Sequence, residues 1–223
     1  MVTEQDENAI FIEDDIIKFE YTEEDGYELD RIKNKINKYT SDSDELSKAL
    51  VSESDKRAKK LNALRNSLPD KFQVVDSFGN RIGNIAYSTS EIKGYSIDEF
   101  KSFSKYGSRG KNGVKNAMEG WVSSVDNPRY SNDVLKINSD NEIDMINGYL
   151  RNNDTEYKII EQYNHILNED YYAEGKIIIV SEREICPSCD NVIKSFSRDY
   201  SNIEITLIDG TGKSYIVKNG LVQ

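Results

Sequence analysis

The sequence predicts an α/β fold, because a strand, a helix and a second strand follow one another in residues 176–209, KIIIVSEREICPSCDNVIKSFSRDYSNIEITLID. The unbroken β-branched run at residues 177–180 is typical of a strand buried on both faces. Apolar residues recur at helical spacing over residues 192–196 and alternate with polar ones over residues 203–207. This order is that of a βαβ unit, and it places the only two cysteines of the chain at the start of its helix.

Composition and charge limit what the chain can bind. The net charge of −11 comes from residues 1–30, which hold twelve acidic residues and one basic residue. Residues 31–223 are therefore balanced in charge, so the acidic pI does not exclude a polyanionic partner. No apolar run approaches the ~20 residues of a membrane span, and the acidic start lacks the pattern of a signal peptide. We therefore expect no membrane partner, and two cysteines three positions apart do not make a secreted disulfide framework.

The N-terminal third is predicted to be an appendage of the main domain. Residues 1–30 form an acidic lead, either solvated or folded as a flap over a basic groove. Residues 28–66 have helical periodicity. Pro69 follows this region, and we place a boundary there, with residues 1–68 as the appendage and residues 69–223 as the main domain.

The next segment is predicted to be a hairpin followed by a long loop-rich region. Strand-like runs at residues 72–76 and 81–88 flank the turn signal Ser-Phe-Gly-Asn. Residues 89–150 are rich in Ser, Asn, Asp, Gly and aromatic residues, and the apolar spacing at residues 100–103 indicates a short helix. A basic run that includes a tyrosine extends from Lys101 to Lys115. A loop-rich span of this length in a compact domain is usually functional or flexible.

A predicted helix at residues 151–167 leads into the βαβ unit, and its apolar residues form one stripe. Asn153 or Asp154 is suited to its N-cap, and Glu156 lies in its first turn. After the βαβ unit, residues 214–222 are expected to add an edge strand to the sheet.

Three kinds of chemistry fit a CxxC motif at a helix N-terminus, where backbone N–H groups and the helix dipole lower the pKa of a thiol. The first is thioredoxin-like redox chemistry, and the second is a structural zinc site completed by His165 and a carboxylate. The third is a catalytic zinc ion with three protein ligands and a fourth position open to water. Nucleobase deaminases use the third arrangement and add a proton-shuttling Glu near the start of the preceding helix. At that position this sequence has Asp154-Thr155-Glu156.

Together these motifs resemble the toxin deaminases of bacterial polymorphic toxin systems, within the cytidine deaminase-like superfamily. The resemblance lies in D-T-E-Y-K-I-I-E at Asp154–Glu161, S-E-R-E-I-C-P-S-C-D-N-V-I at Ser181–Ile193, G-N-I-A-Y at Gly83–Tyr87 and F-K-S-F-S at Phe100–Ser104. It covers roughly residues 72–209. It implies a cytidine deaminase-like three-layer α-β-α sandwich with a mixed sheet of about five strands. Residues 1–68 would then be an acidic lead and a helical pre-toxin segment, and residues 69–223 the deaminase-like toxin domain.

The resemblance also implies a role for each residue of the site. Asp154, Cys186 and Cys189 are expected to hold Zn²⁺, and Glu156 is expected to be the catalytic proton shuttle. The substrate contacts that we predict are Asn84, Ser181, Phe103 and Trp121.

The expected function is zinc-dependent deamination of cytosine in nucleic acid, with single-stranded DNA as the favoured substrate. As the toxin domain of an interbacterial polymorphic toxin, the chain is expected to be secreted or delivered by an upstream module and to act in the cytoplasm of the target bacterium. We expect it to be a monomer that binds a cognate immunity protein. The alternative is a non-catalytic or redox CxxC binding module with a deaminase-like or thioredoxin-like fold.

Overall fold

The computed structural model describes residues 10–12, 15–17, 52–77, 79–97, 99–107 and 116–223. The chain divides into two compact units, Met1–Asp55 and Lys56–Gln223. In the first unit, β1 (Ile10–Ile12) pairs with β2 (Asp15–Ile17) in antiparallel orientation. The rest of the acidic lead and the helix predicted before residue 52 lie outside the described residues. The boundary predicted near Pro69 stays a prediction.

The second unit is built on a mixed six-stranded sheet with the order β10-β9-β8-β7-β3-β4. Its strands are β3 (Ile85–Ile92), β4 (Phe100–Phe103), β7 (Gly175–Ser181), β8 (Ile203–Ile208), β9 (Ser214–Lys218) and β10 (Leu221–Val222). The pair β7–β8 is parallel, and the other neighbours are antiparallel. The predicted mixed α/β sheet is confirmed, with one strand more than the expected number, since the segment after β8 forms a hairpin.

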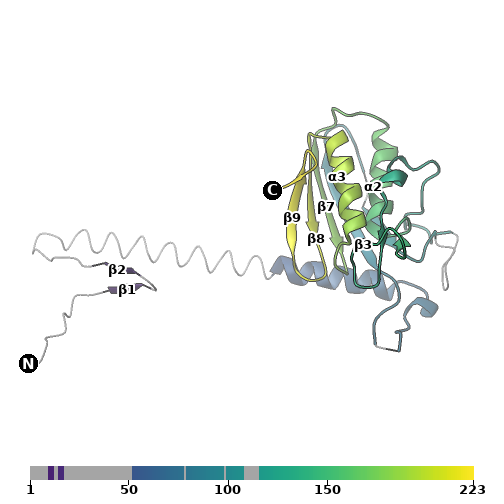
Figure 1. The fold of residues 1–223 in the computed structure, drawn as a ribbon, viewed down its shortest axis with the longest axis horizontal. Helices are drawn as coiled ribbons and strands as arrows, with labels where there is room; N and C mark the ends of the chain where they lie inside the picture. The colour runs from purple at the N-terminus through teal and green to yellow at the C-terminus, as the bar shows by residue number, and fades with distance from the viewer. Residues whose placement is uncertain (1–9, 13–14, 18–51, 78, 98, 108–115) are drawn as a thin grey trace, which may run out of the picture. The chain divides into compact units, whose positions relative to one another are not determined.

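Helices α2 (Thr155–Leu167) and α3 (Pro187–Asp199) lie side by side on one face of the sheet (Figure 1). Both helices and the βαβ connection through α3 are confirmed, although α2 begins at Thr155 and not at residue 151. The main core lies between these helices and the sheet, with Ile177 and Ile179 of β7 among its buried residues. Ile178 between them is 39% exposed, so the prediction that β7 is buried on both faces is wrong at this position.

The opposite face of the sheet is partly covered by residues 56–66, the part of a helix at residues 52–66 that belongs to the second unit. Ile85 and Ala86 are neighbours in β3, so their side chains point to opposite faces. Ala86 belongs to the main core, whereas Ile85 belongs to a second buried cluster against which Leu61 and Leu64 of this helix pack. The described helices therefore lie on both faces of the sheet, as the expected three-layer architecture requires.

Two local predictions between residues 70 and 103 are wrong. The first strand of the predicted hairpin contains part of a 3₁₀ turn, η1 (Asp70–Phe72), and otherwise only one antiparallel bridge, Val75 with Arg81. The residues predicted as a short helix form strand β4, in which Phe103 pairs with Ile85 of β3. Spacing alone suggested a helix, but β3 offers an unpaired backbone edge, and tertiary pairing with that edge decides the conformation.

The remaining described residues of the loop-rich region form short elements beside the helices. They include η2 (Arg129–Asp133), β5 (Lys136–Ile137) and β6 (Tyr149–Leu150), of which β5 and β6 pair as a separate two-stranded sheet. Glu161 of α2 accepts hydrogen bonds from the backbone N–H groups of Arg129 and Tyr130, at 3.0 and 2.7 Å. The region is thus tied to α2, and it ends directly before the N-terminus of that helix.

Arg65 anchors the helix at residues 52–66 to the rest of the unit. Its side chain is 1% exposed and pairs with Glu182, and its guanidinium donates to the carbonyl oxygens of Ile82 and Gly83, at 2.8 and 3.2 Å. We expect Arg65→Met to lower the free energy of unfolding by about 3 kcal/mol, because two carbonyls lose their donor and Glu182 loses its buried partner. Urea unfolding measures the change.

The matched control is Arg81→Met, because Arg81 pairs with the same carboxylate of Glu182, at 3.5 Å, but is about half exposed. An exposed pair of this kind contributes about 0–1 kcal/mol. Equal losses in the two variants would show that Arg65 does not anchor the helix.

Candidate metal centre and adjoining cavity

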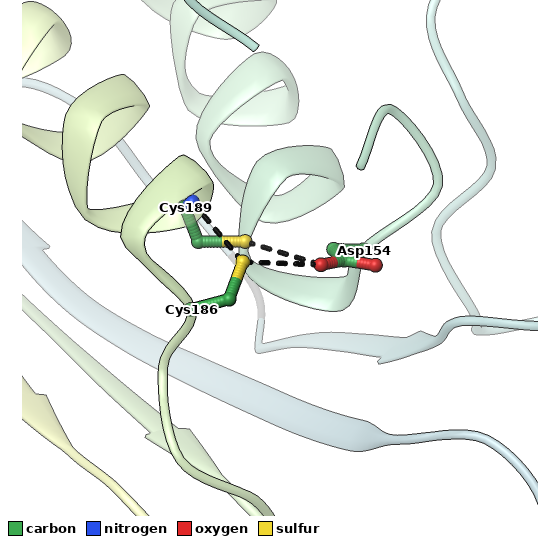
Figure 2. A group of neighbouring side chains, drawn as sticks. All are labelled: Asp154, Cys186 and Cys189. Carbon is green, nitrogen blue, oxygen red and sulfur yellow. Dashed lines mark hydrogen bonds between the residues drawn. The ribbon is translucent and has the colours of Figure 1, made fainter. Parts of the chain in front are cut away.

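Three potential metal ligands converge where the N-termini of α2 and α3 meet (Figure 2). The carboxylate Oδ2 of Asp154 lies 3.3 Å from Sγ of Cys186 and 3.7 Å from Sγ of Cys189, and the three ligand atoms lie within 4.8 Å of one another. In a tetrahedral zinc site, Zn–S bonds of about 2.3 Å and Zn–O bonds of about 2.1 Å put sulfur and oxygen ligands about 3.6 Å apart. The spacing of the described atoms therefore fits a single ion.

The backbone explains why these side chains point at one another. Asp154 and Cys186 are the N-cap residues of α2 and α3, and both have extended backbone conformations. An N-cap aspartate ordinarily accepts a hydrogen bond from its own helix, yet Asp154 makes no such side-chain cap and turns toward the thiols. Cys186 does act as a cap, since its sulfur accepts from the N–H of Cys189 at 3.4 Å. Pro187 fixes the first turn between the two cysteines without losing a hydrogen bond.

The cluster holds acidic groups close together, and this raises the pKa values of Asp154 and Cys189. Burial raises the pKa of Asp154, and the nearby carboxylate of Glu156 raises it further. The pKa of the Cys189 thiol is raised well above its ordinary value, first by its hydrogen bond with Cys186 and then by burial and the two carboxylates. The expectation of a lowered thiol pKa is therefore wrong for Cys189, because these neighbours outweigh the helix N-terminus. A divalent cation would relieve this repulsion, and a set of two sulfurs and one oxygen suits zinc.

Lys158 is a buried basic residue of α2, but it does not neutralise this cluster of acidic groups. Nζ of Lys158 donates to the backbone carbonyls of Phe103 and Tyr106, at 2.6 and 2.9 Å. Burial lowers the pKa of Lys158 to about 7, although the charges of Asp154 and Glu156 oppose this shift. Lys158 thus joins α2 to the end of β4, and its hydrogen bonds go to the backbone rather than to the carboxylates.

Glu156 lies beside the three ligands, in the first turn of α2, and is only 2% exposed. Its carboxylate lies 3.4 Å from the sulfur of Cys189 and accepts a hydrogen bond of 3.1 Å from the amide of Asn84. The same amide nitrogen lies 2.9 Å from the hydroxyls of Thr155 and Ser181. The structure thus brings two of the four predicted substrate contacts, Asn84 and Ser181, to the predicted catalytic carboxylate.

A cavity of about 650 Å³ opens onto this cluster. Asp154, Glu156 and Cys186 form part of its wall, together with Asn84. Oδ1 of Asn84 is buried and accepts no hydrogen bond within the described part of the chain. Basic and exposed apolar side chains complete the wall, among them Lys105, Arg151, Arg183, Tyr149 and Leu150.

Comparison with known proteins decides the family. A model of the toxin-deaminase family, described as the BURPS668_1122 family of deaminases, matches residues 61–210, about two thirds of the chain. The chain belongs to the toxin-deaminase family. No curated protein and no solved structure matches it. Deaminases are hydrolases that act on C–N bonds, and the converging Asp154, Cys186 and Cys189 are a possible metal site of this toxin deaminase.

In the toxin deaminase, the other two predicted substrate contacts belong to the second buried cluster or pack against it. Phe103 is fully buried in the second cluster, where its ring lies edge-on to the ring of Phe72, and it offers no surface on which a base could stack. Trp121 packs against the same cluster, near Tyr106. Neither residue is among those that line the cavity. We assign Phe103 to the core, and a substrate contact by Trp121 stays a prediction.

Several residues of the cavity wall were not predicted from the sequence. Tyr149 and Leu150 come from the loop-rich region, Arg151 lies directly before α2, and Arg183 follows β7. Tyr149 and Leu150 could have been suspected from the sequence, because they are apolar residues next to the helix that carries Glu156.

His165 is exposed near the C-terminal end of α2 and is not part of the site. In the described residues, no helix has the length and apolarity needed to cross a membrane.

Proposed function

We propose that this toxin deaminase is a zinc-dependent enzyme that converts cytosine to uracil in single-stranded DNA. The observation that supports this most directly is the position of Glu156, whose carboxylate lies 3.4 Å from one of the three converging ligands and lines the same cavity. A purely structural CxxC site has no need of a buried carboxylate at that place.

Asp154, Cys186 and Cys189 would hold the zinc ion. When bound, zinc lowers the pKa of a coordinated water and so makes a nucleophile available near neutral pH. Glu156 would accept a proton from the water whose oxygen bonds to the amine-bearing carbon, and would deliver that proton to the neighbouring ring nitrogen. It would then carry the second proton of this oxygen to the amino group, which leaves as ammonia as the C–N bond breaks. Asn84 holds the carboxylate of Glu156 through its amide N–H, while its unpaired Oδ1 can accept a hydrogen bond from a substrate hydroxyl or amine.

The cavity wall supports a nucleic-acid strand as the substrate. Lys105, Arg151 and Arg183 supply positive charge for a phosphate backbone, and Tyr149, which is 75% exposed, offers a ring on which a base can stack. A single strand is favoured because a base in a duplex must first be unstacked and unpaired, at a cost of a few kcal/mol. The choice of cytosine rests on the family resemblance.

The biological setting that we propose follows from the family. A toxin of this kind is delivered by an upstream module and acts in the cytoplasm of the target bacterium, and a cognate immunity protein protects the producer. We propose that the enzyme acts as a monomer, since one chain by itself supplies all three ligands and Glu156.

Sequencing after incubation tests the proposal. The zinc-loaded protein is incubated with single-stranded DNA, duplex DNA and RNA, each of which is then sequenced. We expect C-to-T changes chiefly in the single-stranded DNA. A-to-G changes would assign adenine as the target base, and changes chiefly in RNA or duplex DNA would overturn the choice of strand. The absence of changes in all three substrates would favour a non-catalytic binding module.

A further inference from the structure

Arg151 lies on the cavity wall three residues before Asp154, in the segment that joins β6 to α2. Within the part of the chain that the structure describes, the guanidinium of Arg151 has no hydrogen-bond acceptor, and its Nε is buried without a partner.

A buried donor without an acceptor is unusual in a folded protein and calls for an explanation, such as a bound ion or ligand. The other arginine of the wall differs, because the guanidinium of Arg183 donates to the backbone carbonyl of Arg81 at 2.5 Å. Arg151 is therefore the wall arginine whose terminal N–H donors are left for a ligand. A guanidinium suits phosphate in particular, since it can bind two phosphate oxygens at once.

We propose that Arg151 binds a phosphate of the substrate, the phosphodiester next to the base that is deaminated. The inference rests on the proposed function, and it adds a reason for the enzyme to prefer a nucleotide chain to a free nucleoside. Its basis is the juxtaposition of an unpartnered guanidinium with the Asp154–Cys186–Cys189 cluster in a single cavity. The same chemistry would bind the terminal phosphate of a mononucleotide, so the experiment must distinguish these two sources.

The test measures binding without turnover, in the zinc-loaded full chain carrying Glu156→Gln. The probe is a fluorescent single-stranded oligonucleotide with one cytosine, in which the phosphodiester beside that cytosine is either normal or replaced by a neutral methylphosphonate. We expect the methylphosphonate to weaken binding about tenfold, as loss of one charge-assisted contact does. In the Arg151→Met variant this difference in binding should disappear. The slope of the logarithm of the association constant against the logarithm of the salt concentration should become shallower by about 0.7.

Arg183→Met is the matched control, because it removes a charge from the same wall and should leave the methylphosphonate effect in place. A methylphosphonate placed several nucleotides away is the second control. Metal content and thermal unfolding show whether Arg151→Met is folded. An equal methylphosphonate penalty with and without Arg151 would overturn the proposal.

Competition by deoxycytidine and by its 5′-monophosphate separates the two sources of phosphate. If Arg151→Met removes a preference for the monophosphate but leaves the oligonucleotide data unchanged, the residue binds a terminal phosphate, and the proposed phosphodiester contact is overturned. Failure of the proposed function would look different. The wild-type protein would then leave every cytosine unchanged in the sequencing assay, whatever the binding data show about Arg151.

Discussion

Glu156→Gln is expected to lower the rate of deamination by about 10³-fold, which makes it the most damaging single substitution of a residue that is not a proposed metal ligand. The replacement keeps the size of the side chain and an oxygen that can accept from the amide of Asn84. It removes the group that accepts and returns the proton, and general acid–base catalysis of this kind contributes about 10²–10⁴ in rate. Initial rates on a single-stranded oligonucleotide, with the zinc content of each preparation, measure the effect.

The matched control for this prediction is Glu174→Gln. Glu174 is an exposed carboxylate that pairs with Lys93, before the first residue of β7. Glu156 lies at the other end of that strand, where Ser181 contacts Asn84. The control should deaminate at the wild-type rate. A Glu156→Gln protein that holds zinc and deaminates normally would remove Glu156 from the mechanism.

The site could be predicted from the sequence because its ligands belong to locally determined elements. The run at residues 177–180, the CxxC motif and the helix after it fix the positions of Cys186 and Cys189 within one βαβ unit. Asp154 was identified through the same kind of signal, the N-terminus of a periodic helix. The resemblance then linked the two helix starts, and the distances between the three ligand atoms agree with that link.

The parts that the sequence could not predict depend on contacts between distant segments. The spacing of Phe100 and Phe103 fits a helix as well as a strand, and only pairing with β3 selects the strand. The aromatic character of Phe103 suggested stacking on a base, but burial against Phe72 and Tyr106 decides its role. A polar residue gives no sign in the sequence of which cavity it will face, and Arg151, which stands at the start of the predicted helix, was missed for that reason.

The helix at residues 52–66 illustrates the same limit. Its periodicity was recognised, but nothing local indicates that Arg65 reaches the carbonyl of Gly83, the residue before Asn84. That contact crosses from an N-terminal helix to the turn that carries a wall residue of the cavity. The family match begins at residue 61, within this helix. The position of Asn84 therefore depends in part on a segment that sequence reasoning assigned to an appendage.

Removal of the metal is expected to abolish deamination and to lower the melting temperature by about 10 °C. Without an ion, Asp154, Glu156 and Cys189 crowd one another in a buried site, and burial and mutual repulsion raise the pKa values of Asp154 and Cys189. An ion present at about 1,000 times its dissociation constant stabilises the folded state by about 4 kcal/mol. In a domain of this size, each kcal/mol shifts the melting temperature by about 2–4 °C.

Cys186→Ser distinguishes loss of the ion from damage by the chelator, because it removes one ligand and changes little else in the N-cap of α3. The wild-type protein should carry about one zinc per chain, as three convergent ligands require. After chelation, its melting temperature and activity should return when zinc is added. The variant should lack zinc, melt near the chelated wild type and gain nothing from added zinc, since two remaining ligands hold the ion too weakly. A variant that keeps its zinc and its activity would show that these sulfurs do not form the metal centre, and the deaminase mechanism proposed for this cavity would fail with it.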